Sequence, residues 1–511
     1  MLAVASDAGV GLPLEHTLRV CRIATRVAAH MGLSAEQQSD VYFTSILKDS
    51  GCTSWTTQLA TFISADEIAA RFDFLFRTDS SSNLDVLRWV LAHVGAHSGP
   101  LERTMRVVDF MAHGRDFTRE GYQSSVEVAR RIAQRLGLSA GVQEALLTVF
   151  EHWDGRGMPR GLRGEAIPLV SRIVYPSIYV EVCHGAGGLD AVRSLLAQRR
   201  GKAFDPAVTD ALEAVAKEKS FWLGLQQQSV WEAVTEAFPE AIAARSENDL
   251  LEAFALTVAD FVDMKSHYLA GHSRRVAELV GAMAVRAGLP VSDMTRIRRA
   301  ALLHDIGLVA VPSYVINQSG RGMDRTQTAR MQSHPKFGAD LLRRAVALRD
   351  TVGIVAAHHE QPDGHGYPSG LAGSDIPLGA RFIAVADRFD ELTHDGSAHL
   401  AMPPEAALES IAAQVGPVFD QEAFEALRDA QDASIGRPVD SRPPAWPEGL
   451  TDREVEVLRL AASGMTRRDM AKRLVVAEST VRHHMESIYS KLGVSTRVGA
   501  VLFAVEHRLV T

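Results

Sequence analysis

The chain has 511 residues, of which 46% are hydrophobic and 23% charged, and its formal net charge is −8. This composition is typical of a globular protein of about three domains and excludes disordered and collagen-like chains. The acidic balance excludes a protein that binds nucleic acid over its whole surface, so such binding is expected in one domain only.

The cysteines and the hydrophobic runs indicate the cellular compartment of the protein. Cys21, Cys52 and Cys183 are far apart and form no CxxC pair, which excludes a disulfide framework and a zinc ribbon. The N-terminus has no basic region followed by an apolar stretch, as a signal peptide would. No run approaches the roughly 18 apolar residues of a membrane helix. We expect a cytoplasmic protein with no membrane partner.

Apolar residues recur with the period of an α-helix over long stretches of the chain. The clearest cases are residues 16–33, 126–138 and 272–289, where they recur three and four positions apart. Alternating strand patterns are scarce. We therefore predict an all-α protein.

Most of the chain is an internal repeat. Residues 16–20 and 46–51 recur 256 positions later, and residues 154–162 and 167–172 recur 209 positions later. Constant spacing over separate blocks indicates a duplication. The two spacings differ by 47 residues, which predicts an insertion in the first copy between about residues 55 and 120.

The first copy lacks most of the polar residues that mark the second. It retains His16 and Asp49. Seven positions of the second copy hold histidine or aspartate, as described in the next paragraph. At the other five of the corresponding positions the first copy has, in chain order, Lys48, Ser125, Val149, Phe150 and Ile178. Two ligands cannot hold a pair of metals, so this copy is predicted to be a scaffold, a dimerisation unit or a pocket for an unknown ligand. For Lys48 and Asp49 a plain ion pair is favoured.

The second copy holds five histidines and two aspartates at positions that suit metal binding. They are His272, His304, Asp305, His334, His358, His359 and Asp387. One transition metal takes four to six ligands, some of them water in a catalytic site, so seven protein ligands predict two metals. Neighbouring side chains on a helix diverge by about 100°, so each member of an adjacent pair can reach a different metal.

This second copy, over roughly residues 265–430, resembles the HD-GYP branch of the HD phosphohydrolase superfamily. The matching motifs are HDIG at 304–307, HHE at 358–360, DGHGYP at 363–368 and VAD at 385–387. The resemblance implies an all-helical bundle with two divalent metals, iron or manganese, and many members hydrolyse cyclic di-GMP. It also implies that Asp305 bridges the metals, that Asp305 and His304 are catalytic, and that Tyr367 contacts substrate.

By the same resemblance, each metal has its own set of histidines. His272, His304 and Asp387 would complete one site. His334, His358 and His359 would complete the other.

Two departures from the family pattern concern the substrate, and a third concerns an additional metal. The family lysine three residues after the aspartate is Leu308 here, and the Arg-Pro-Tyr segment that usually follows the VAD motif is missing. Tyr268 stands where a three-metal variant has glutamate. These differences leave the metal site intact but disfavour cyclic di-GMP as the substrate.

A proline cluster precedes the last domain. Four prolines fall within residues 438–447, which predicts a linker. Thr451 and Glu454 form a capping-box pattern at the start of the next helix. Seven basic and three acidic residues lie between 467 and 497, which predicts a local phosphate-binding patch in an acidic protein.

The segment from Leu450 to Arg497 resembles the LuxR/GerE-type DNA-binding domain over its whole length. The resemblance implies a helix-turn-helix. Its implied DNA contacts are Thr480, Arg482, His483, His484 and Lys491. Val481, Ile488 and Leu492 are expected in the core, and Ala477 replaces the serine that often caps the recognition helix in this family.

Together these patterns predict two HD-type helical bundles followed by a four-helix LuxR-type domain. The expected divisions are a degenerate HD domain at 1–220, a helical connector at 221–264, an HD-GYP-like domain at 265–431, a linker at 432–447 and the DNA-binding domain at 448–511. We expect a homodimeric transcriptional regulator whose metal domain senses or hydrolyses a phosphorylated or cyclic nucleotide. Two alternatives remain: a metal-binding pseudoenzyme sensor, and HD domains that serve only as a dimerisation scaffold.

Overall fold

The computed structural model describes residues 1–78, 83–96, 98–227, 229–237, 247–318, 322–435 and 446–510. Throughout these residues the regular structure is helical and no β-strand is present, so the predicted all-α class is confirmed. The chain divides into two units, Leu2–Leu250 and Leu251–Thr511. No single helix of the described chain is long and apolar enough to cross a membrane; α25 and α26 pass that test only as a pair bent by 62°.

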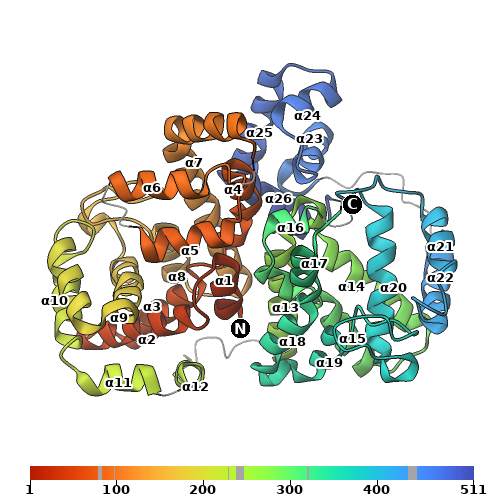
Figure 1. Cartoon of the computed structure of the whole chain (residues 1–511), viewed down its shortest axis with the longest axis horizontal. Helices are drawn as coiled ribbons and strands as arrows, with labels where there is room; N and C mark the ends of the chain where they lie inside the picture. The colour runs from red at the N-terminus through yellow and green to blue at the C-terminus, as the bar shows by residue number, and fades with distance from the viewer. Residues whose placement is uncertain are drawn as a thin grey trace. The chain divides into compact units, whose positions relative to one another are not determined.

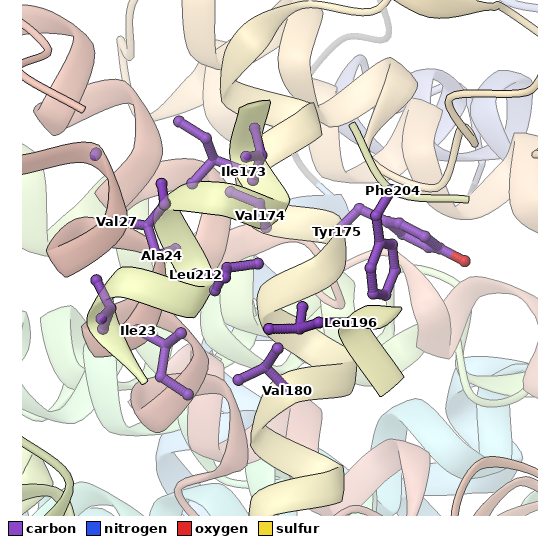
Figure 2. Packing of buried hydrophobic residues seen from close by; sticks show 14 of the residues in the cluster. Ile23, Ala24, Val27, Ile173, Val174, Tyr175, Val180, Leu196, Phe204 and Leu212 are labelled. Carbon is purple, nitrogen blue, oxygen red and sulfur yellow. The ribbon is translucent and has the colours of Figure 1, made fainter. Parts of the chain in front are cut away.

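The first unit is built of helices, of which α7 and α9 are the longest (Figure 1). In chain order its helices are α1 (Leu2–Val10), α2 (His16–His30), α3 (Ala35–Leu47), η1 (Cys52–Trp55), α4 (Thr56–Ile63), α5 (Glu67–Arg77), α6 (Asn83–His93), α7 (Pro100–Arg135), α8 (Ala140–Thr148), η2 (Gly164–Ala166), α9 (Leu169–Arg199), α10 (Pro206–Val215), α11 (Lys219–Gln227) and α12 (Val230–Glu236). The main core lies among α2, α9 and α10, and Figure 2 shows side chains of these helices gathered in one cluster. A smaller core involves α4 to α7, where the insertion was predicted.

The second unit opens with the end of α13 (Glu247–Asp263). Its HD copy then contains η4 (His267–Leu269), α14 (His272–Arg286), α15 (Val291–Leu303), η5 (Ile306–Ala310), α16 (Ser313–Ile316), α17 (Arg325–Gln332), α18 (His334–Arg343), η6 (Val346–Thr351), α19 (Val352–Ala356), η7 (Gly373–Asp375), α20 (Leu378–Thr393), α21 (Pro404–Ala412) and α22 (Gln421–Ile435). Asp263 of α13 accepts hydrogen bonds from Ser273 of α14, so part of the predicted connector belongs structurally to this copy.

The two copies repeat the same hydrogen bonds at the predicted spacings. Glu151 accepts from the backbone of residues 160 and 162, and Glu360 accepts from residues 369 and 371, each 209 positions later. Gly51 and Gly307 repeat a close approach 256 positions apart. A Cβ on Gly307 would lie 1.9 Å from the carbonyl oxygen of His334, so only glycine lets η5 approach α18 this closely.

The last domain consists of η8 (Pro447–Gly449), α23 (Asp452–Ala462), α24 (Arg467–Leu474), α25 (Glu478–Leu492) and α26 (Arg497–Glu506). Its own hydrophobic core includes the buried side chains of Val481 and Ile488, with Leu492 packed against them, as expected. Thr451 and Glu454 form the predicted capping box, whereas Ala477 provides no side-chain cap for α25. Most of the predicted linker, residues 436–445, lies outside the described residues.

Candidate metal centre

Helix ends position six of the seven predicted ligands, and the interior of α20 positions the seventh. His272 begins α14, and His304 and Asp305 directly follow α15. His334 begins α18, in the first turn of which its backbone packs against Gly307. The remaining ligands are His358 and His359, just after α19, and Asp387 on α20. Four helix ends and the interior of α20 thus converge on one place in the second copy.

The converging side chains form two groups. Ligand atoms of His334, His358 and His359 lie within 4.8 Å of one another, and so do those of His272, His304 and Asp305. Asp387 joins the second group, because its Oδ1 lies 3.2 Å from Nε2 of His272. Each group has the size and the donor types of a transition-metal site.

Asp305 lies between the two groups. Its Oδ2 is 3.4 Å from Nε2 of His304 and 3.8 Å from Nε2 of His272. Its Oδ1 is 3.3 Å from Nε2 of His334 and 3.9 Å from Nε2 of His358. One oxygen therefore faces each group, which is the arrangement that a bridging carboxylate requires.

The histidine rings are oriented by bonds on their far side. Nδ1 of His304, His334 and His358 each lies 2.7 Å from the backbone carbonyl oxygen three residues earlier. Donation to these carbonyls leaves the Nε2 lone pairs pointing inward. Nε2 of His304 is buried without a hydrogen-bond partner, and Nε2 atoms of His334 and His358 lie 3.1 Å apart. Converging lone pairs with no donor between them fit a bound cation.

Electrostatics favours the protonation states that bind metal at His358, His359 and Asp305. At His272 burial acts to lower the pKa, but Asp387 and Asp390 outweigh it and raise the pKa well above its usual range. Burial, followed by His334 and His304, lowers the pKa of His358 to about 3. Burial and His358 likewise hold the pKa of His359 well below its usual range. Burial acts to raise the pKa of Asp305, but His304, His334 and His272 outweigh it and lower the pKa well below its usual range. Neutral imidazoles and an ionised carboxylate are the forms that bind metals.

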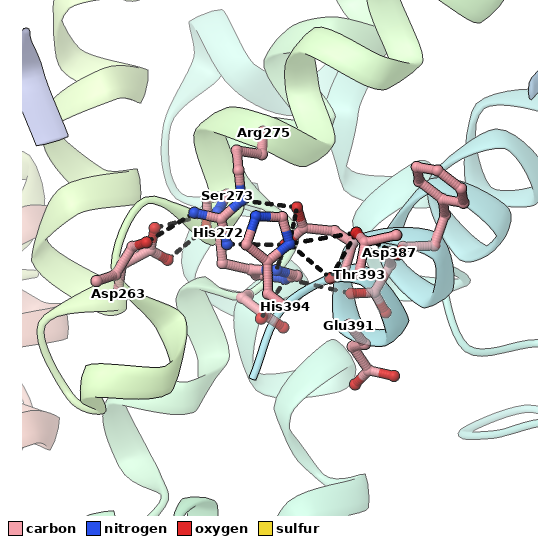
Figure 3. Close-up of polar contacts among 12 residues, drawn as sticks. Asp263, His272, Ser273, Arg275, Asp387, Glu391, Thr393 and His394 are labelled. Atoms are coloured by element: carbon pink, nitrogen blue, oxygen red, sulfur yellow. Dashed lines mark hydrogen bonds and ion pairs between the residues drawn. The ribbon is translucent and has the colours of Figure 1, made fainter. Parts of the chain in front are cut away.

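A polar network that the sequence patterns did not predict supports His272. Figure 3 shows Asp263 and Ser273 on one side of this histidine and Asp387 on the other. Nδ1 of His272 lies 2.8 Å from Oδ2 of Asp390, and Arg275 donates to both oxygens of Asp390 at 2.7 and 3.0 Å. Asp390 therefore fixes the ring of His272, as carboxylates commonly do for metal-binding histidines.

A cavity of about 340 Å³ opens over the centre. Five of the predicted ligands line it, together with Tyr367, whose ring stacks on His359 at 4.8 Å. Leu308 and Tyr268 also line it, so neither departure from the family pattern is remote from the site. Arg388 is the one arginine or lysine among the described residues that line this cavity. Its Nη1 donates to Oε2 of Glu391 at 3.0 Å.

The first copy keeps the supporting network but not the ligands. His16 bonds to Glu181, and Arg19 donates to the same carboxylate, so these residues repeat the contacts of His272, Arg275 and Asp390. Lys48, at the position of His304, is buried; its ammonium group pairs with Asp49 and lies 3.3 Å from the hydroxyl oxygen of Thr17. The favoured ion pair is present, and a lysine cation occupies the place beside the aspartate.

The predicted DNA contacts lie on or near α25 of the last domain. Thr480, Arg482 and His483 are exposed, and His484 is half-buried. Lys491 is held within the domain, because its ammonium group donates to Glu454 at 2.7 Å and to the carbonyl of Gly449 at 3.0 Å. Its role as a DNA contact stays a prediction, and so do the roles of the other four residues.

Comparison with known proteins gives matches to both parts of the chain. A family model described as HD domain matches residues 109–208 and 257–423, and one described as bacterial regulatory proteins, luxR family, matches residues 448–504. The chain is 30% identical over 429 residues to the 3′3′-cGAMP-specific phosphodiesterase 3 of Vibrio cholerae serotype O1. The matched region covers 84% of this chain and 93% of that protein.

Two further matches concern the HD region. The chain is 33% identical over 205 residues to the cyclic di-GMP phosphodiesterase response regulator RpfG of Xanthomonas campestris, over 40% of this chain and 54% of that protein. The crystal structure of a cyclic GMP-AMP specific phosphodiesterase of Vibrio cholerae matches with a TM-score of 0.57 and 27% identity, over 84% of this chain and 96% of that chain.

Proposed function

The chain belongs to the HD domain family and carries a luxR-family regulatory domain, and from this premise we propose that it is a DNA-binding regulator whose second HD copy hydrolyses a cyclic dinucleotide. The observation that carries the proposal is the pair of ligand groups around Asp305 on the wall of a cavity of about 340 Å³. A relative that resembles most of the chain is named for 3′3′-cGAMP, which makes that compound the first substrate to test.

In this proposal two divalent cations, iron or manganese, share Asp305. His272, His304 and Asp387 complete one site. His334, His358 and His359 complete the other. Bound there, the cations would polarise a phosphodiester and lower the pKa of water between them. The inward lone pairs and the buried, unpartnered Nε2 of His304 support this assignment.

The residues of the cavity would orient the dinucleotide. Burial, followed by Asp387 and Asp305, raises the pKa of Tyr367, so its hydroxyl group stays protonated at neutral pH and can donate a hydrogen bond to substrate. Arg388 supplies the cation that Leu308 cannot, and we propose that it contacts a phosphate. Glu391, which pairs with Arg388 in the structure, would hold the guanidinium group toward the cavity.

The test is hydrolysis by the full chain, reconstituted with manganese or iron and given 3′3′-cGAMP or cyclic di-GMP. We expect linear product from 3′3′-cGAMP, faster than from cyclic di-GMP, and no product after chelation. His304→Ala should abolish the reaction. His365→Ala is the matched control, because this histidine is 83% exposed in the neighbouring DGHGYP loop. Activity that survives chelation, or no activity in the metal-loaded protein, would refute the enzymatic proposal.

A pseudoenzyme sensor is the second candidate, favoured by the apolar Leu308 on the cavity wall. It predicts that 3′3′-cGAMP binds the metal-loaded chain without turnover. In either case the ligand should change the affinity of the full chain for DNA, which a titration of labelled duplex with and without the dinucleotide measures. Unchanged DNA affinity with a saturated cavity would exclude regulation of DNA binding by this ligand.

A further inference from the structure

The first half of α7 presents large apolar side chains on two opposite sides. The inner side packs into the smaller core of the first unit through Val107, Phe110 and Phe117. The outer side presents Leu101, Met105, Val108 and Met111, which are 77%, 58%, 64% and 64% exposed. Their spacing of four, three and three residues places them on one outer face, here called the α7 stripe.

The α7 stripe is unusual for this chain. A surface helix normally has one apolar face, and a helix that is apolar on both sides is normally buried on both. Fourteen large hydrophobic residues are exposed in the part of the chain that the structure describes. Seven of them lie on α6 and α7, where Leu84, Leu87 and Leu91 of α6 join the four of the stripe. Scattered exposed residues are ordinary, but a concentration of this kind marks an interaction site.

The position of the stripe suggests an addition to the HD fold. The family model begins to match at residue 109, so α6 and the first turns of α7 precede the HD match. They fall within the insertion that distinguishes the first copy from the second. An added element with a separate small core and an uncovered apolar face is suited to assembly.

We infer that the α7 stripe is the face on which a second copy of this chain docks, with the two α7 helices antiparallel. A two-fold axis near Arg106 would set Leu101 against Met111 and Met105 against Val108, so the stripe is complementary to itself, as such an interface requires. The flanking charges are already bonded within the helix, Glu102 to Arg106 and Asp109 to His113. Each of these four charged side chains therefore has a partner within its own helix before docking.

The identity of the partner rests on the DNA-binding part of the proposed function. The chain carries one luxR-family domain, and one helix-turn-helix contacts one half-site. Paired half-sites need two such domains, which a second copy of the chain supplies. The dimer itself can be measured without DNA, nucleotide or metal, so its failure is distinct from failure of the proposed function.

Sedimentation equilibrium of the full chain tests the inference. We expect a dimer at micromolar concentration for the wild type and at least about 100-fold weaker association for a double variant, Leu101→Glu with Val108→Glu. Val285→Glu and Val346→Glu are matched controls, because both residues are more than half exposed outside the stripe, and both variants should stay dimeric. A wild type that stays monomeric at concentrations well above micromolar, or a double variant that remains dimeric, would overturn the inference.

Cross-linking provides a second measurement that does not depend on introducing charge. Met105→Cys places a thiol beside the inferred axis, so a short bis-maleimide should join two chains of this variant and not two chains of Val285→Cys. Cys21 is buried and Cys52 and Cys183 are half-buried, so the wild type sets the background. Equal cross-linking of both variants would overturn the inference even if the charged double variant did not fold.

Discussion

Replacing Asp305 by asparagine tests the metal centre with the smallest change of shape. Each carboxylate oxygen lies 3.3–3.9 Å from Nε2 atoms of a different histidine pair. The amide removes the negative charge and turns one oxygen into a donor that faces an imidazole. Loss of a residue that hydrogen-bonds to a metal ligand typically lowers the affinity for the metal about 10- to 100-fold. Because Asp305 faces both ligand groups, we expect Asp305→Asn to lower the metal affinity more than 100-fold, which is about 3 kcal/mol.

The assay is metal analysis of protein purified without chelator. The wild type should carry close to two iron or manganese ions per chain, and Asp305→Asn fewer than one. Asp49→Asn in the first copy is the matched control, since Asp49 and Asp305 are 256 residues apart in equivalent positions. That variant should keep its metals but lose about 3–5 kcal/mol of unfolding free energy, because it leaves buried Lys48 unpaired. Full metal content in Asp305→Asn would refute the bridging assignment.

Three further variants test other parts of the proposal. Arg388→Gln should raise KM about 10- to 100-fold at unchanged metal content, because a charged hydrogen bond to phosphate is lost. Arg343→Gln, which breaks an exposed ion pair, is the control. An unchanged KM in Arg388→Gln would remove Arg388 from the substrate site. Glu454→Gln should cost the isolated last domain about 1–3 kcal/mol at pH 7. Burial acts to raise the pKa of Glu454, but Lys491 and its other partners lower it to about 2. The stabilisation by the ionised carboxylate is therefore present above pH 4.5 and is lost as the pH falls toward 2. Urea titrations at several pH values should find this pH dependence of the unfolding free energy only in the wild type. Arg482→Ala should weaken DNA binding. If Arg482 contacts a phosphate, the affinity should fall by a similar factor on every duplex and the salt slope should be smaller by about one, whereas a guanine contact predicts a loss of about 1–3 kcal/mol at one base. Equal affinity of the variant and the wild type for every duplex would exclude Arg482 as a contact.

The sequence predicted the helical class, the duplication and the ligand set, because each leaves a regular trace. Periodicity marks the helices, and constant spacing marks the repeat. Asp390 was missed because a single aspartate one helical turn from a ligand has no pattern of its own. The repeat contained a signal, since Glu181 stands 209 residues earlier and makes the same contacts to His16 and Arg19. Comparing acidic residues between the copies would have found both.

Tertiary contacts of charged side chains could not be read from the sequence. Lys491 was predicted to contact DNA because it is basic and follows the recognition motif. In the structure its ammonium group donates to Glu454, 37 residues away, where the capping box of α23 already fixes the carboxylate, and its role as a DNA contact stays a prediction. A basic residue predicts a charge but not its partner. The difference between the two repeat spacings predicted the insertion in the first copy. The sequence could not predict which side of α7 is exposed, because this depends on which of its two apolar faces the smaller core covers.

The two copies share one framework around different side chains at the predicted metal positions. Both hold a histidine at the start of a helix by a carboxylate and an arginine, and both place an aspartate nearby. In the first copy the ammonium group of Lys48 neutralises Asp49 from within the chain. In the second, histidine replaces that lysine, and Nε2 of His304 is buried beside Asp305 without a hydrogen-bond partner. Because five of the seven positions differ, the first copy lacks most of the predicted ligands, and we expect only the second copy to bind metal at this position.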